Sequence, residues 1–70
     1  MRWAVVIEKA ERNFAAYVPD LPGCVATGAS IEETESSIRE AVEFHVEGLR
    51  ADGIAVPHAS SRVAYVEIEA

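Results

Sequence analysis

The chain has 70 residues, a length that suits one domain with a single small core. Half of its residues are hydrophobic, and 12 acidic against six basic residues give a net charge of −6, which fits a globular chain rather than a disordered one. The basic residues are scattered singly, so the basic stripe that nucleic acids and anionic membranes require is missing.

The start of the chain carries no targeting pattern. Its longest apolar run, residues 3–7, is too short for a signal peptide or a membrane span. The single cysteine cannot form an internal disulfide. We therefore expect a cytoplasmic protein. Because domains of this size are only marginally stable alone, we also expect a homodimer or a higher homo-oligomer.

The first third of the chain predicts two strands joined by a tight turn. Residues 2–8 alternate, with three apolar side chains on one face: Trp3, Val5 and Ile7. Residues 10–13 are polar, and Asn13 tolerates the left-handed backbone of a tight hairpin. Residues 14–18 form the second predicted strand.

A rigid loop and a third strand follow. Residues 19–23 contain two prolines, which fix two φ angles, and Gly23 supplies any positive φ that the loop requires. Residues 24–28 then form a short strand, which we expect to pair with the second one.

The strongest local pattern predicts a helix from residue 31 to about residue 52. Ser30 and Glu33 match a capping box, and Gly53 marks the end. The helical spacing predicts an apolar stripe that consists of Ile31, Ile38, Ala41, Val42, His45 and Leu49.

The last third predicts a loop over residues 51–61 and a final strand over residues 62–69, where apolar residues alternate again. The order is therefore β-β-β-α-β. We predict an α+β fold over residues 1–70, a two-layer sandwich in which one long helix covers one face of an antiparallel sheet. The other face is left open in a monomer, which favours dimerisation.

No residue pattern predicts catalysis or a metal site. Cys24 has no basic partner suggested by the chain order, so we interpret it as a structural thiol, with redox chemistry or a partner contact as the alternative. His45 belongs to the packed helix face and His58 to a surface loop. Glu43 and Glu47 are spaced like metal ligands, but no histidine joins them. We expect no cofactor.

An acidic face runs along the predicted helix. It consists of Glu32, Glu35, Glu40, Glu43 and Glu47, and it is interrupted by Arg39. Such a face keeps a protein soluble, and it also suits a docking surface for a basic partner.

Several segments resemble the HicB-like antitoxin family. They are residues 14–24 (Phe-Ala-Ala-Tyr-Val-Pro-Asp-Leu-Pro-Gly-Cys), 26–28, 31–34, 38–49 and 53–57. The resemblance covers most of the chain, and its Pro-Asp-Leu-Pro-Gly-Cys element is fairly specific in this setting. It implies a partial RNase-H-like fold with the order β-β-β-α-β, without nuclease activity.

The resemblance also implies a function. A HicB-like antitoxin binds a small basic partner, the HicA-type mRNA endonuclease, and masks its active site. Many members add a C-terminal DNA-binding segment. We expect no such segment here after the last predicted strand, and no direct nucleic-acid binding, so transcriptional autoregulation does not carry over from the resemblance.

We predict that the toxin contacts lie on the rigid loop and on the acidic helix face. The loop would present Leu21 at little ordering cost, because its prolines fix the backbone. The predicted contact residues are Asp20, Leu21, Pro22, Gly23, Cys24, Glu40, Glu43 and Glu47. The alternative function is an orphan, non-catalytic binding or regulatory module that has no toxin partner.

Overall fold

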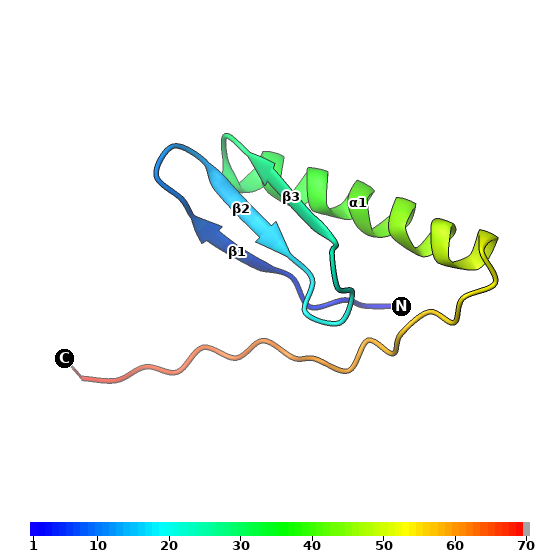
Figure 1. The fold of residues 1–70 in the computed structure, drawn as a ribbon. Helices are drawn as coiled ribbons and strands as arrows, with labels where there is room; N and C mark the ends of the chain where they lie inside the picture. Colours follow the sequence, from blue (N-terminus) through cyan, green and yellow to red (C-terminus); the bar gives the residue numbers. More distant parts are fainter. Residues whose placement is uncertain (70) are drawn as a thin grey trace.

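A computed structural model describes residues 1–69, which form a three-stranded sheet, one long helix and an extended C-terminal tail (Figure 1). The strands are β1 (Val6–Lys9), β2 (Phe14–Tyr17) and β3 (Val25–Gly28), and the helix is α1 (Ile31–Ala51). The sheet order is β1-β2-β3 and both pairings are antiparallel. The predicted α+β class, with one helix against one face of an antiparallel sheet, is confirmed.

β1 begins later than residues 2–8 predict. Val6 pairs with Tyr17, the last residue of β2. Beyond that pair the chain turns into the loop that leads to β3, so residues 2–5 have no strand opposite them. The β1–β2 turn closes with the Ala10 N–H donated to the Asn13 carbonyl at 2.8 Å. Within residues 1–69 only glycines have positive φ, so the left-handed conformation expected of Asn13 is wrong.

α1 begins and ends as the sequence predicts. The Ser30 hydroxyl accepts a hydrogen bond from the Glu33 N–H at 3.1 Å, and Glu32 and Glu33 place negative charge in the first turn. At the other end, Gly53 has a φ of 70°, and the Ile54 N–H is donated to the Leu49 carbonyl at 2.8 Å.

The core lies between the sheet and α1. Its fully buried hydrophobic residues are Ala16, Val18, Leu21, Cys24 and Ile38. Partly buried side chains surround them, including Trp3, Val5 and Ile7 from the first segment and Val42, Val46 and Leu49 from α1. α1 packs closely on β3 and β2 and only loosely on β1, so the β1 side of the core is the more open one.

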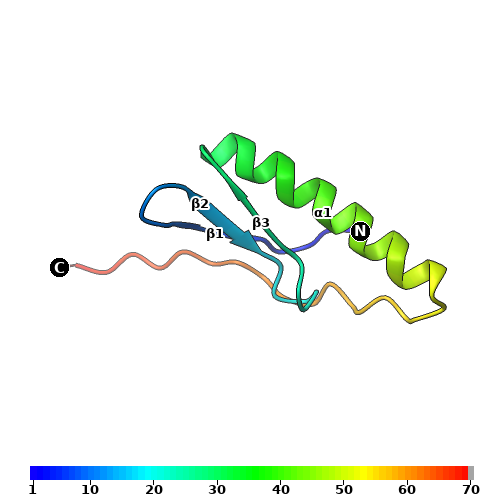
Figure 2. The ribbon, with the colours of Figure 1, turned by 45° about the horizontal axis from the view of Figure 1, so that its top comes forward.

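The predicted fourth strand is not part of the sheet. Within residues 1–69 the sheet contains only β1, β2 and β3, and residues 62–69 form an exposed, extended tail. Figure 1 and Figure 2 show this tail passing the β1 side of the sheet without joining it. Alternating side chains favour an extended backbone, but they do not determine which strand it pairs with.

Candidate functional site

The loop between β2 and β3 is built around its own buried side chains. Leu21 donates its N–H to the Val18 carbonyl at 3.1 Å, and Cys24 donates its N–H to the Leu21 carbonyl at 3.0 Å. These turns direct Leu21 into the core, where its side chain is 0% exposed. The prediction that the loop presents Leu21 to a partner is therefore wrong, because a fully enclosed side chain cannot reach one.

Cys24 is buried in the same way. Its side chain is a free thiol in the core cluster, and burial raises the pKa of the thiol because the thiolate would lose its hydration. Direct contact between this side chain and a partner, one of the predicted contacts, is excluded by its burial. The interpretation of Cys24 as a structural thiol fits this environment.

Asp20 holds the start of the C-terminal tail. Its carboxylate accepts hydrogen bonds from the Ser61 N–H at 2.8 Å, from the Ser61 hydroxyl at 2.7 Å and from the Ser60 hydroxyl at 3.5 Å. The Ser61 N–H bond is the main reason why the pKa of Asp20 lies below its ordinary value. We call these three bonds the Asp20 clasp. Nothing in the local sequence around Asp20 indicates it, because the two serines follow about 40 residues later.

The remaining loop residues are accessible. Pro22 and Gly23 are exposed at the tip, and Gly23 has a φ of 83°, which confirms the positive φ expected there. Of the five predicted loop contacts, these two keep a surface free for a partner.

The three predicted helix contacts, Glu40, Glu43 and Glu47, are all exposed on α1. Successive helical residues are about 100° apart, so Glu40 points almost directly away from the buried Ile38 and from the sheet. Glu43 and Glu47 lie nearer to the first segment of the chain, and both border the space between it and α1. The acidic face is therefore exposed to solvent. It lies on α1, whereas the loop joins β2 and β3 (Figure 1).

An aromatic residue, Phe44, lies on this face and was not among the predicted contacts. Phe44 is 80% exposed and lies one turn from both Glu40 and Glu47. A large apolar side chain outside the apolar stripe was the available signal. Within the acidic surroundings of α1, Phe44 offers the kind of aromatic anchor that protein interfaces use. We call Phe44 with Glu40, Glu43 and Glu47 the acidic–aromatic face.

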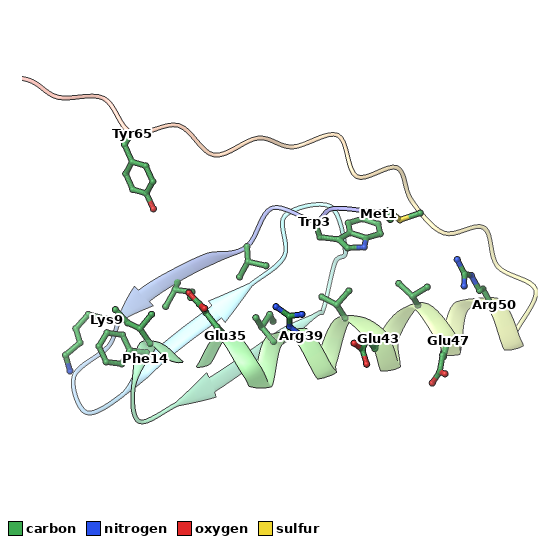
Figure 3. Close-up of a pocket in the computed structure, with 16 residues that line it drawn as sticks. Met1, Trp3, Lys9, Phe14, Glu35, Arg39, Glu43, Glu47, Arg50 and Tyr65 are labelled. Carbon is green, nitrogen blue, oxygen red and sulfur yellow. The ribbon is translucent and has the colours of Figure 1, made fainter. Parts of the chain in front are cut away.

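A second surface feature is an open groove of about 1170 Å³ between α1 and the first segment of the chain (Figure 3). Apolar side chains line it, among them Trp3, Val5, Ile38, Val42 and Val46. Charged side chains of α1 stand at its rim, namely Glu35, Arg39, Glu43, Glu47 and Arg50, so the groove shares Glu43 and Glu47 with the acidic–aromatic face. Tyr65 of the tail points toward the groove. The groove exists because α1 packs only loosely on β1.

Within residues 1–69, no three His, Cys, Asp or Glu side chains gather closely enough to hold a metal ion. The helix α1 is too polar to cross a membrane.

Comparisons with known proteins agree with this architecture. A UPF0150 protein of Helicobacter pylori is 44% identical over 64 residues, which cover 90% of this chain and 89% of that protein. A protein of Haemophilus phage HP1 is 32% identical over 66 residues. These cover 94% of this chain but only 50% of the phage protein, so the chain spans about half of that relative.

A solved structure of a HicA3 and HicB3 toxin-antitoxin complex contains a similar chain. The two chains superpose with a TM-score of 0.69 at 29% identity, over 79% of this chain and 64% of the other. The model of the HicB-like antitoxins of bacterial toxin-antitoxin systems matches residues 3–69. With nearly its whole length matched, and with the fold of a chain from a toxin-antitoxin complex, this chain belongs to the HicB-like antitoxin family.

Proposed function

We propose that the protein is the antitoxin of a type II toxin-antitoxin pair and that it masks a small basic HicA-type mRNA endonuclease in the cytoplasm. The observation that carries this proposal is the family match over residues 3–69, together with the structural likeness to a chain of a HicA3 and HicB3 complex. An RNA-cutting toxin must bind phosphates, so its active surface should be basic. A partner with a net charge of −6 complements such a surface.

The acidic–aromatic face is the contact surface that we propose. Its three glutamates attract a basic toxin and accelerate encounter, whereas Phe44 supplies apolar area that becomes buried in the complex. Pro22 and Gly23 are the loop residues that we retain as contacts. Leu21 and Cys24 act only by shaping the loop, and both Asp20 oxygens already accept bonds from the tail.

The mechanism is inhibition by surface burial, without any chemical step on this chain. Covering the basic surface of the toxin excludes RNA, because the negative face takes the place of the phosphate backbone. The affinity should therefore fall with added salt, as expected of an interface steered by charge.

The test is a search of the neighbouring genes for a HicA-type protein, followed by a binding titration with that protein. Phe44→Ala should weaken binding by about tenfold or more. Ile54→Ala is the control, because Ile54 is also an exposed apolar residue but lies outside the acidic–aromatic face. Glu47→Lys should slow association, whereas Glu11→Lys, which changes the charge equally in the β1–β2 turn, should not.

Absence of a complex at micromolar concentration in low salt would contradict the proposal. In that case the orphan binding or regulatory module is the remaining function. The open groove between α1 and the first segment, with its apolar lining, is the observation that favours that alternative.

A further inference from the structure

The C-terminal tail exposes apolar side chains on both of its sides. Tyr65 is 96% exposed, and Val66 and Ile68 are each 83% exposed. Successive side chains of an extended segment point in opposite directions, so Tyr65 lies on one side of the tail and Val66 and Ile68 lie on the other. Such a segment is stabilised when it pairs with another strand and its apolar side chains are buried. Residues 62–69 are not paired, and their side chains are exposed.

The exposed area of the whole chain shows how much surface remains uncovered. The chain exposes 5737 Å². A compact monomer of 7.6 kDa is expected to expose about 4300 Å². The radius of gyration is 13.6 Å, against about 11 Å for a compact domain of this length. The chain thus exposes about 1400 Å² more than a compact monomer of its mass.

A matching acceptor lies at β1. This strand is at the edge of the sheet, so every second N–H and C=O group along it has no strand partner. β3 is the other edge strand, but none of its residues lines the apolar groove. Beside β1 the apolar groove stays open, with Trp3, Val5 and Val42 among its lining residues (Figure 3). The edge and the groove together offer both hydrogen-bonding groups and apolar surface to an added strand.

The tail starts at the Asp20 clasp and is not paired with the β1 edge of its own chain. An open cleft of about 500 Å³ separates the start of the tail, residues Ala59 and Ser61 to Val63, from residues Arg2 to Val5. The bonds of 2.8 Å and 2.7 Å from Ser61 to Asp20 fix the start of the tail on the far side of this cleft. Pairing with another chain leaves these bonds intact.

We propose that residues 62–69 of one copy pair as a strand with the β1 edge of a second copy, and that the exchange is reciprocal in a two-fold symmetric dimer. Each chain then donates one tail and accepts one. Burying about 1400 Å² on each of two chains gives about 2800 Å² in total, which lies in the range of permanent dimers. The dimer requires no toxin, so its test is independent of the proposed function.

The first measurement is the mass of the purified chain in solution by light scattering. We expect about 15 kDa, twice the mass of one chain. Val66→Pro or Tyr65→Pro should shift the protein to about 7.6 kDa, because adjacent N–H groups of a strand point to opposite sides and one of these two must face the partner strand. Val66→Thr is the matched control: it keeps both the N–H and a β-branched side chain, so it should remain dimeric. A monomeric wild-type chain overturns the proposal.

The second measurement identifies which chain the tail pairs with, and it uses only the wild-type protein. In a mixture of isotope-labelled and unlabelled chains, filtered NMR spectra should show contacts between tail protons of one copy and β1 amide protons of the other. Contacts between the tail and β1 that occur only within one chain overturn the proposal, even if the mass is that of a dimer. This NMR measurement tests the exchange of tails between copies even if the proline variants fail to fold.

Discussion

Gly28 and Thr34 approach so closely that a Cβ atom on Gly28 would lie 2.6 Å from the Thr34 hydroxyl and 2.7 Å from its backbone nitrogen. Thr34 is fully buried, and its hydroxyl donates to the Ser30 carbonyl at 2.7 Å, which fixes it in the first turn of α1. The end of β3 therefore packs directly on the start of α1, and only glycine fits between them.

Gly28→Ala should lower the free energy of unfolding by about 1–3 kcal/mol, because the added methyl group must displace buried backbone. Gly48→Ala is the matched control. A Cβ at this exposed helical position meets no atom within 4 Å, and alanine favours a helix by about 0.5–1 kcal/mol over glycine. Urea unfolding at a fixed chain concentration measures the free energy of unfolding of both variants. Equal effects of the two substitutions would contradict the close approach.

Leu21→Ala should destabilise the protein by about 2–5 kcal/mol, because it leaves a cavity in the core. Pro22→Ala, one residue along the same loop, should cost less than about 1 kcal/mol, since Pro22 is exposed. Thermal or urea unfolding distinguishes the two. If Leu21 served only as a surface contact, its replacement would leave the stability unchanged.

Cys24 should react slowly with a thiol reagent at pH 8. The side chain is buried, and burial keeps its pKa above the ordinary value of 9.0, so both access and the thiolate fraction are low. We expect labelling of the folded protein to be about 100-fold slower than in urea, which corresponds to opening free energies of about 3 kcal/mol. Similar rates in the folded and unfolded protein would show that the thiol is accessible.

The Asp20 clasp should open only in acid. Its hydrogen bonds favour the ionised carboxylate, so the pKa of Asp20 in the folded protein lies below the ordinary value of 3.8. The stabilisation from this ionised form is therefore complete above pH 3.8 and is lost as the pH falls through the lowered pKa. The NMR shift of the Ser61 amide should report this titration, and in Asp20→Asn it should stay constant. A Ser61 transition centred above pH 3.8 would show that the clasp does not favour the carboxylate.

Helix capping, turn residues and side-chain alternation predicted the parts of the fold that depend on residues close together in the sequence. The bounds of α1 follow from the Ser30 cap and from Gly53, and the loop conformation at Gly23 follows from the freedom of glycine. The two hairpin pairings follow from short alternating segments separated by turn residues.

Features that depend on distant residues were missed or misjudged. The same Pro-Asp-Leu-Pro-Gly-Cys element that indicates the family also suggested a surface loop, yet Leu21 and Cys24 are buried because the loop folds back under β2 and β3. No periodic pattern connects Asp20 with Ser61. Phe44 was overlooked because helical periodicity identifies the buried side of a helix and gives no role to an apolar residue on the other side.

The exposed tail also bears on how long the protein survives in a cell. Proteases bind their substrates as extended chain, the conformation that residues 62–69 adopt, so an unpaired tail is a ready site of cleavage. A tail enclosed between two copies would be protected. Degradation would then begin from the monomer, and the lifetime of each chain would rise with its own concentration.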